Sequence, residues 1–570
     1  LAVLQHTSFH TRARDMGIYA QILWNASQGR GLASTLLMEN TNHLAEHVAP
    51  VLWLIAPIYG LAPNPAALVI LQQLFLAASG IPVFFWARRV LNQDLLALLV
   101  LTTYLAMPAM SRIALSEFHP VVMAALPAAT AAYGVFTGQT RITLIGVGLC
   151  LFMEEETALV IAGLGMSWLV MHRQRWPVGA ALIGIALTWA ILVAFVIMPA
   201  FQHRVSREAG NRATGHYEDV QKDPLGTIGS YATQRTSRVA EWLVLPNAGL
   251  SLVSPHILLA AMPTTLMLFL QDRADTYGGH WAGAMMPLFG MATASGLARL
   301  RQFSGRLGWI GAAVLAIVAS GTYLVHSHFP GGRDFEVEKF STTQVEHDLA
   351  EAVRLVPAGT RVTASRRVVP HLAHRPEVWQ FPPSFYASAL RPDAARQDAY
   401  IFDLTDSPTR RALEDLNGDT VLTRRPRLHL RQFGDSVLLL TRDQPAPTAL
   451  TSVTFPGVVS LGGFDLEQTP GEVRLRAYWE PLGRSQREVV RLVRLTDDAG
   501  LALAERQDIP LQALLPPTRW ERGQTVAEQV SLPLPAGYRG TFRILVGWRE
   551  TIDGVPLRSD GGADLVEIYR

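Results

Sequence analysis

The chain has 570 residues, a length at which several domains are expected in place of one hydrophobic core. Hydrophobic residues make up 49% and charged residues 17%; the formal net charge is only +2, and no basic patch with interleaved aromatic residues points to nucleic acid. The only cysteine, Cys150, excludes a disulfide within the chain and a cysteine-based metal site. Apolar runs fill 48–330, whereas 331–570 has no run long enough to span a bilayer.

The first residues have the pattern of a membrane edge. Residues 1–4 are apolar and fit the tail of a first membrane helix that is truncated or missing. The stretch 15–28 has amphipathic spacing, which predicts an interfacial helix. Asp15 is either the N-cap of that helix or a functional carboxylate, a general base or a ligand for a divalent cation on a phosphate. Its position near the membrane predicts a raised pKa.

Apolar runs of about 20 residues predict the membrane-spanning helices. They lie at 66–87, 93–112, 120–137, 176–200, 281–298 and 307–327. The run 142–171 predicts a hairpin of two short helices, and 241–271 predicts a second hairpin, broken near Pro246 and Pro255. The segment 48–62 is short for a span, so we expect a re-entrant or interfacial helix there.

Arginine-rich turns set the expected orientation, because positive residues favour the cytoplasmic side of the membrane. These turns are Arg88-Arg89, Arg141, 172–175 and 299–306. With all of them in the cytoplasm, the polar residues at the opposite helix ends and the whole of 331–570 face outside. We therefore expect a multi-pass protein of the inner or plasma membrane with an extracytoplasmic C-terminal half.

Two groups of polar residues precede the third predicted span. His43 and His47 are four residues apart, so on a helix they share one face. They are half of a zinc site, a polar interfacial turn or a phosphate-binding pair. Glu117 and His119 stand just before Pro120, where a helix cap explains the proline but does not require a histidine.

Three adjacent carboxylates, Glu154-Glu155-Glu156, interrupt an apolar run. In lipid they must reach water, a cation or a partner charge, although a solvated turn between helices also accommodates them. Successive helical positions diverge by about 100°, so we expect only one or two to face a common site. His280 opens another span beside Trp281, either as an interfacial anchor or as part of the site.

The polar half predicts two soluble domains. Residues 331–445 are expected to form a small α/β domain, with a helix near 342–355 and strands at 361–365, 399–403 and 436–441. A Pro-rich linker at 444–448 leads into 446–570, where alternating strands such as 473–479 and 541–547 predict an antiparallel β-sandwich. Its Trp and Tyr residues are expected in the core, with sugar binding by exposed aromatic residues as the alternative. The predicted fold class is thus a polytopic α-helical membrane protein with a soluble α/β domain and a β-sandwich.

A resemblance rests on the order and spacing of several short segments. They are Arg14-Asp15-Met16-Gly17-Ile18-Tyr19 with Gln21 and Trp24, His43 and His47 with Pro50, Pro57-Ile58-Tyr59, Gln72 or Gln73, Phe118-His119-Pro120, Glu155-Glu156, and His280 with Pro287. Over about residues 5–440 the chain resembles the predicted membrane proteins catalogued as domain of unknown function 2079. It departs from their usual pattern at Met16, where Leu is common, and at 154–156, where a Lys-Glu-Asp-like triplet is common.

That family is similar in layout to C-type glycosyltransferases, which carry an acidic residue in the first outer loop. The resemblance implies inverting transfer of a sugar from a polyprenyl-phosphate donor to an unknown envelope glycan, lipid or protein, with Asp15 as the general base. The residues expected to bind substrate or phosphate are Arg14, His43, His47, Arg112, His119 and His280. Those expected to position the acceptor or bind a cation are Glu117, Glu155 and Glu156. Mg²⁺ or Mn²⁺ is the candidate cofactor.

Two other functions remain open. Acidic residues within broken helices also suit a transporter or lipid flippase, although the apolar pattern shows no internal repeat and the polar residues are predicted at one face. The third hypothesis is a non-catalytic envelope assembly protein whose soluble half carries out its function.

Overall fold

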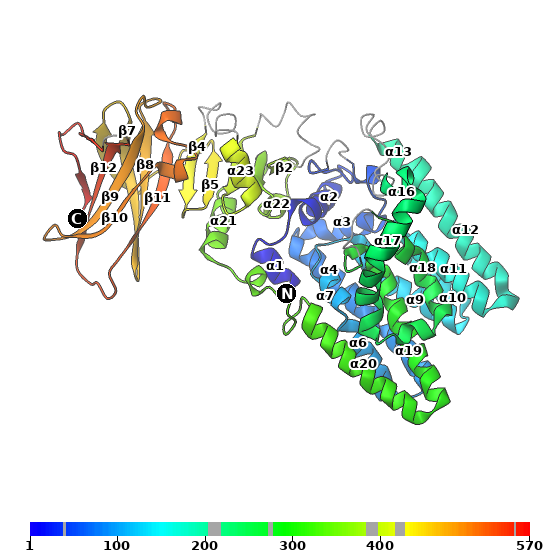
Figure 1. Cartoon of the computed structure of the whole chain (residues 1–570). Coiled ribbons are helices and arrows are strands. Elements are labelled where there is room, and N and C mark those ends of the chain that lie inside the picture. The colour runs from blue at the N-terminus through cyan, green and yellow to red at the C-terminus, as the bar shows by residue number, and fades with distance from the viewer. Residues whose placement is uncertain (38–41, 203–217, 272–276, 384–396, 416–427, 552–553) are drawn as a thin grey trace. The chain divides into compact units, whose positions relative to one another are not determined.

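The computed structural model describes residues 1–37, 42–202, 218–271, 277–383, 397–415, 428–551 and 554–570. The chain divides into two compact units, Leu1–Ser341 and Thr342–Arg570. Each unit has a hydrophobic core of its own. The first unit is helical and the second consists mostly of strands (Figure 1).

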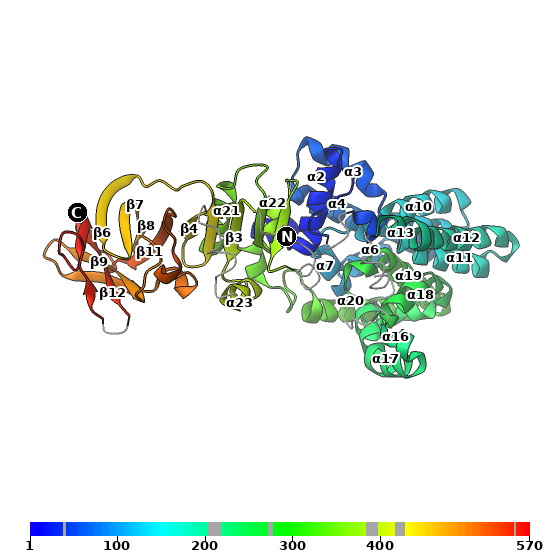
Figure 2. The same cartoon turned by 90° about the horizontal axis from the view of Figure 1, so that it is seen from above.

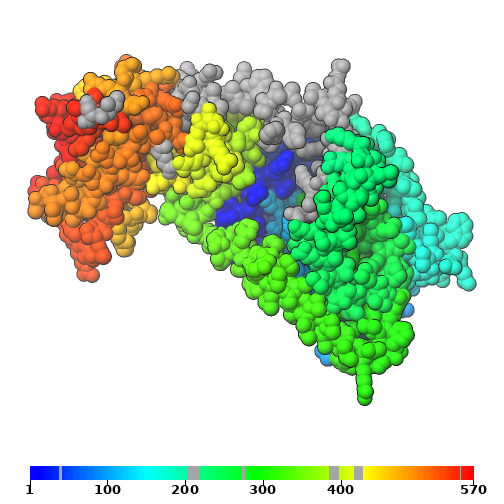
Figure 3. Space-filling view, in the orientation of Figure 1, coloured from blue at the N-terminus to red at the C-terminus, as the bar shows by residue number. Residues whose placement is uncertain are grey.

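The first unit is a bundle of apolar helices (Figures 1 and 2). Its described α-helices are α1 (Ala2–Thr7), α2 (Ile18–Ser27), α3 (Val51–Leu61), α4 (Pro65–Ala78), α5 (Gly80–Leu91), α6 (Asp94–Leu105), α7 (Pro108–Ala114), α8 (Pro120–Met123), α9 (Ala125–Thr137), α10 (Thr140–Met153), α11 (Thr157–Met171), α12 (Trp176–Leu192), α13 (Met198–Phe201), α16 (Glu218–Lys222), α17 (Pro224–Val239), α18 (Pro255–Leu270), α19 (Met286–Phe303) and α20 (Gly305–His326). On the face in Figure 3, much of the green surface belongs to α17, α18 and α20.

Several helical stretches are long and apolar enough to cross a membrane. Within the described residues there are four: Pro65–Leu91, Pro120–Thr137, Arg173–Phe201 and Gly305–His326. The pair α6 and α7, bent by 54°, makes a fifth if it is one span. The predicted multi-pass membrane architecture is thereby confirmed.

Local sequence explains where these helices begin and end. Asn64 caps α4 by accepting a hydrogen bond from the backbone N–H of Ala66, and Pro65 occupies the first turn, where its missing N–H has no cost. Asn92 ends α5 and Gly138 ends α9, each in the left-handed conformation that these two residue types adopt most readily.

Glycines allow the helices to approach one another closely. A Cβ atom on Gly163 of α11 would lie 2.1 Å from the carbonyl oxygen of Ala260 in α18. A Cβ atom on Gly146 of α10 would lie 2.4 Å from the backbone nitrogen of Ala131 in α9. Small residues at such crossings are the usual means of packing helices in lipid, where no hydrophobic effect drives them together.

The predicted hairpin at 142–171 is confirmed. Helices α10 and α11 are separated by the acidic triplet, which lies in a non-helical break because Glu154 has extended backbone angles. The segment 48–62 contains only the 11-residue helix α3, which is too short to span a bilayer.

Three other boundaries differ from prediction. The expected span at 281–298 is shifted, because His280–Met285 forms a 3₁₀ turn and α19 starts at Met286, with Pro287 in its first turn. The expected hairpin at 241–271 contains one long helix, α18, since Pro246 and the left-handed Gly249 leave only short turns before it. The region between the predicted span 176–200 and the predicted hairpin at 241–271 contains α16 and α17, while 203–217 lies outside the described residues.

The helix predicted at 15–28 begins later and is more buried than expected. A π-helical turn, Ala13–Gly17, precedes α2, and most side chains of α2 are buried within the unit. Its polar residues bond to protein: Gln21 accepts a hydrogen bond from Ser34 Oγ at 2.6 Å. The amphipathic pattern of this helix therefore reflects a buried polar contact with the loop that follows it.

The second unit contains a nine-stranded sheet in the order β2-β1-β3-β5-β4-β11-β8-β7-β6. Its elements are α21 (Gln344–Arg354), β1 (Val362–Ser365), α22 (Val369–Leu372), β2 (Val378–Phe381), β3 (Ala399–Asp403), α23 (Ser407–Asp415), β4 (His429–Phe433), β5 (Val437–Thr441), β6 (Ala449–Phe455), β7 (Val459–Thr469), β8 (Glu472–Pro481) and β11 (Val526–Pro533). Strands β1, β2 and β3 are parallel to one another, and β6, β7, β8 and β11 are antiparallel. The expected helix and strands are confirmed. The sheet continues past the predicted linker, because β4 pairs with β11.

A second sheet completes the β-rich part of this unit. It comprises β9 (Val489–Asp497), β10 (Ala502–Asp508), β12 (Phe542–Glu550), β13 (Pro556–Leu557) and β14 (Val566–Tyr569). Trp479, Trp520 and Trp548 are fully buried in the shared core, and Trp548 makes edge-on ring contacts with the other two at 5.2 and 6.0 Å. These tryptophans are core residues, as predicted.

The separate cores predict that the first unit folds without the second. A chain ending at Ser341 should accumulate in membranes and elute as a single species in detergent, because its hydrophobic cluster is complete within 1–341. Membrane fractionation and size-exclusion chromatography measure this. Loss of the truncated chain from membranes that retain the full chain would contradict it.

Candidate functional site

Asp15 and His119 meet at one end of the helical bundle. Asp15 lies in the π-helical turn before α2, and His119 immediately precedes α8. Asp15 Oδ1 lies 3.5 Å from His119 Nε2. The imidazole is buried, whereas the carboxylate of Asp15 remains 45% exposed. A ligand in the solvent can therefore contact this carboxylate.

Hydrogen bonds hold His119 in one orientation. Its Nδ1 lies 2.8 Å from the carbonyl oxygen of Glu117, which can only accept, so Nδ1 carries a proton and Nε2 is the nitrogen that faces Asp15. The backbone N–H of His119 donates to Gln72 Oε1 at 2.7 Å. A buried glutamine of α4 therefore positions the loop that bears the histidine.

The Glu117 side chain fixes the position of Asp15, the partner of His119. Its two oxygens accept hydrogen bonds from the backbone N–H groups of Arg12 and Met16, both at 2.8 Å. These residues flank Asp15 on either side. Glu117 is thus a positioning residue for the turn that carries Asp15.

Aromatic rings link His119 to the second polar cluster. The His280 ring stacks on His119 with centroids 3.5 Å apart. Tyr19 makes edge-on contacts with His119 at 5.8 Å and with His43 at 5.3 Å, and the rings of His43 and His47 are 5.7 Å apart. A continuous series of rings therefore joins Asp15 and His119 to His47.

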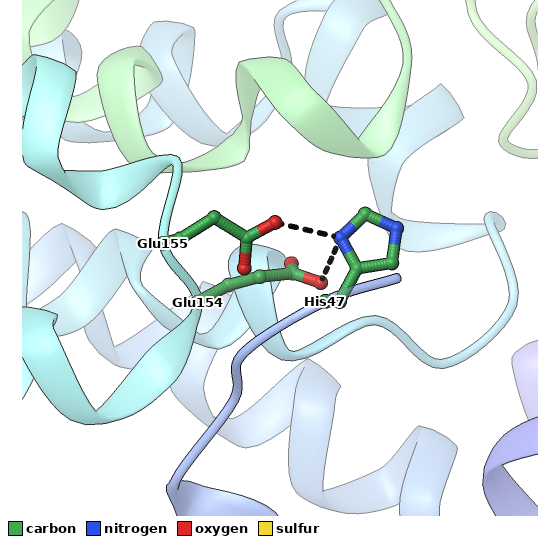
Figure 4. A group of neighbouring side chains, drawn as sticks. All are labelled: His47, Glu154 and Glu155. Carbon is green, nitrogen blue, oxygen red and sulfur yellow. Dashed lines mark hydrogen bonds and ion pairs between the residues drawn. The ribbon is translucent and has the colours of Figure 1, made fainter. Parts of the chain in front are cut away.

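His47 faces two carboxylates of the acidic triplet (Figure 4). Its Nδ1 is 2.9 Å from Glu155 Oε1 and 3.5 Å from Glu154 Oε1. The second oxygens of these acids accept backbone hydrogen bonds, from Val48 at 2.8 Å and from Val121 at 3.0 Å respectively. The two glutamates thus tie the break between α10 and α11 to the loop after His47 and to the first turn of α8.

The donor atoms of His47, Glu154 and Glu155 all lie within 4.8 Å of one another. One imidazole and two carboxylates are suitable ligands for a divalent cation. The zinc option raised for His43 and His47 as a pair is different from this arrangement, because the partners of His47 are the glutamates.

The electrostatics of Asp15 differ from prediction. Burial raises the pKa of this carboxyl, but the hydrogen bond with His119 and the charge of that ring lower it more. The charges of His280 and Arg14 lower it further, and the resulting pKa is about 2. The expected increase is therefore wrong: proximity to cationic groups outweighs removal from water, and Asp15 is ionised at neutral pH.

With this geometry established, the chain can be compared with known protein families. The profile of a family described as predicted membrane protein, domain of unknown function 2079, covers residues 5–421. The chain belongs to this family. No curated protein matches it.

The remaining predicted site residues of this family member are less closely associated. Arg14 is exposed and acts on Asp15 through its charge. The Arg112 guanidinium lies 5.5 Å from the ring centroid of Trp242, a cation–π contact. Glu156 Oε2 is buried without a hydrogen-bond partner in the described part of the chain.

Sequence reasoning missed three contributors: Glu154, Tyr19 and Gln72. The divergence of adjacent helical positions predicts that one or two residues of the triplet face a common site, and the family resemblance favours Glu155 and Glu156. Because the triplet lies in a break, Glu154 and Glu155 can both turn toward His47. Tyr19 and Gln72 belong to the segments that carry the family resemblance, which was the available signal.

Glu154 should contribute substantially to stability. Replacing it by alanine leaves the buried N–H of Val121 without its acceptor, at a cost of about 1–3 kcal/mol in the free energy of unfolding. Glu154→Gln keeps an acceptor oxygen and should lose less. Denaturation in detergent, with a chelator present to exclude effects of bound cations, measures both variants. The control is Glu338→Ala, an exposed acid in the same unit, and equal stability of all three variants would contradict the assignment.

Proposed function

We propose that this membrane protein transfers a sugar from a polyprenyl-phosphate donor to an envelope acceptor, with Asp15 as the general base. The observation that supports this is the half-exposed carboxylate of Asp15 facing a buried histidine at the ends of apolar helices. A base at that position is within reach of a lipid-linked substrate whose reactive carbon lies at the membrane surface.

In this proposal the reaction is an inverting displacement at the anomeric carbon. The acceptor hydroxyl oxygen bonds to that carbon as the bond to the donor phosphate breaks, and the hydroxyl proton passes to Asp15. The polyprenyl phosphate leaves as an anion. His280 and Arg14, whose charges act on Asp15, are placed to stabilise the phosphate through charge and hydrogen bonds.

A carboxylate with a pKa of about 2 is a weak base, and this restricts the timing of proton transfer. Glycosyl transfers proceed through an oxocarbenium-like transition state in which the bond to the leaving group is largely broken. The attacking hydroxyl becomes strongly acidic only once it has begun to bond to carbon. A weak, ionised base is sufficient for such a late proton transfer.

The proposed location of the site is the outer face of the membrane. His119 lies at the start of the stretch that ends at Thr137. The acidic triplet lies between the C-terminal end of α10 and the N-terminal end of α11. The basic turns at Arg141 and 173–175 occupy the opposite ends of those helices. Under the positive-inside rule, this separation supports an external site and an extracytoplasmic second unit.

Asp15→Asn should abolish sugar transfer while leaving the protein in the membrane. The substitution removes the base and keeps the shape, and loss of a general base typically costs about 10²–10⁴-fold in rate. The measurement is transfer of radiolabelled sugar from polyprenyl-phosphate donors in membranes that contain equal amounts of each variant.

The matched control for this experiment is Asp94→Asn. Asp94 is exposed at the start of α6 and pairs with Arg88 at 2.8 Å, so its loss should leave transfer unchanged. Wild-type rates in the Asp15→Asn variant would eliminate Asp15 as the base. Absence of transfer by the wild-type protein from every polyprenyl-phosphate sugar supplied would reject the function.

The pH dependence of transfer should report the surroundings of Asp15. In the wild-type protein the rate should not fall on acidification to about pH 4, because Asp15 stays ionised down to its pKa of about 2. In His119→Gln the hydrogen bond and the charge of His119 that lower this pKa are lost, while the charges of His280 and Arg14 remain, so protonation and loss of rate should begin at higher pH than in the wild type. Normalised pH–rate profiles of the two proteins test this. Parallel profiles that differ only in height would show that His119 does not set the pKa of Asp15.

One observation favours transport as the second candidate function. Carboxylates lie where α10 and α11 break, and α6 and α7 meet at a bend of 54°, features that also occur in ion-coupled carriers. Reconstituted vesicles distinguish the two functions: substrate that crosses the bilayer unchanged supports transport or lipid flipping, whereas a new glycosidic bond supports the enzyme. An assembly protein would do neither.

A further inference from the structure

The cluster of His47, Glu154 and Glu155 has the dimensions of a coordination sphere. Ligand atoms of Zn²⁺ lie about 2.0–2.2 Å from the ion, so neighbouring ligands of a tetrahedral site are roughly 3.4 Å apart. In this cluster Nδ1 of His47 lies 2.9 Å and 3.5 Å from the two carboxylate oxygens. Figure 4 shows both carboxylates directed at the same ring nitrogen.

The two carboxylates are oriented before any ligand binds. One oxygen of each accepts a backbone hydrogen bond, from Val48 or Val121, and the other oxygen points toward His47. Backbone partners of this kind fix the direction of a ligand and increase its affinity for a metal. Glu154 is only 2% exposed, so solvent contributes little to the oxygen that faces His47.

A second, independent feature beside the cluster is the side chain of His43. It is 2% exposed, its ring lies 5.7 Å from that of His47, and neither of its nitrogens has a hydrogen-bond partner in the part of the chain described. Buried polar groups in proteins are almost always paired, because leaving one unpaired costs about 1–3 kcal/mol. Water bound to a cation at the cluster would supply a partner for this imidazole.

We propose that His47, Glu154 and Glu155 bind one divalent transition-metal ion, with His43 holding a water molecule on that ion. An imidazole ligand favours Mn²⁺ or Zn²⁺ over Mg²⁺ or Ca²⁺, which prefer oxygen ligands throughout. The two carboxylates balance the charge of the ion. Three protein ligands also leave a coordination position for water or a phosphate oxygen, as in catalytic zinc sites. The ion would join two chain segments, the loop that carries His47 and the break between α10 and α11, whether or not the protein transfers sugar.

Metal binding by the full chain tests this site directly. The purified protein, with any histidine tag removed and stripped with a chelator, is dialysed against Mn²⁺ or Zn²⁺, and bound metal is measured by elemental analysis and by Mn²⁺ electron paramagnetic resonance. The wild-type protein should retain one equivalent. The ion should also raise the melting temperature, because it binds only the folded state.

Two variants and one control identify the ligands. Glu155→Gln keeps an oxygen for the Val48 N–H and His47→Gln keeps a polar side chain, so each should remain folded in the absence of metal while binding the ion at least about tenfold more weakly. Glu338→Gln, in an exposed turn, should bind as the wild type does. Retention of less than a stoichiometric amount by the wild-type protein, or equal binding by all four proteins, would overturn the site. Both readouts are independent of catalysis, so a failed transfer assay does not affect them.

Discussion

Glu154 and Glu155 occupy the break between two apolar helices, a position where a carboxylate must have partners because lipid provides none. Their oxygens are shared between His47 and the backbone N–H groups of Val48 and Val121. In meeting this requirement they draw the first loop and the start of α8 against the same point. The rest of the polar site depends on that junction, since α8 directly follows His119.

Glu117, two residues before His119, is a third acid whose carboxylate has backbone groups as partners. Its carboxylate accepts from Arg12 and Met16 and so holds the turn that presents Asp15. The site is thus built from acids with different tasks. Glu117, Glu154 and Glu155 bind backbone groups and are tied into the fold, whereas Asp15 keeps a half-exposed carboxylate beside a cationic environment. Asp15 is more exposed than these acids and accepts no backbone hydrogen bond from the described residues, and these two properties distinguish the acid suited to chemistry from those that shape the site.

The second unit also contains buried charged groups, and they pair with each other within its own core. Arg491 is almost fully buried in the β-rich part and pairs with Glu528, which also accepts a hydrogen bond from Trp479 Nε1. This ion pair and the buried tryptophans lie within the same core, so strands β8, β9 and β11 are joined by charge as well as by apolar packing. Because β4 pairs with β11, the sheet also joins the α/β part to the sandwich. The predicted boundary at 445 therefore falls within a connected sheet.

Hydrophobic runs and strand alternation in the sequence determined the class of fold, most spans, the hairpin of α10 and α11 and the strands of the second unit, because these depend on the local periodicity of apolar residues. The same information identified Asp15, His119 and the acidic triplet as polar groups that need partners. It did not determine which partners they have. The role of Glu154, the clamp formed by Glu117 and the low pKa of Asp15 each depend on residues about 30 to more than 100 positions away. Such contacts are decided by how the helices pack, and only the tertiary structure contains that information.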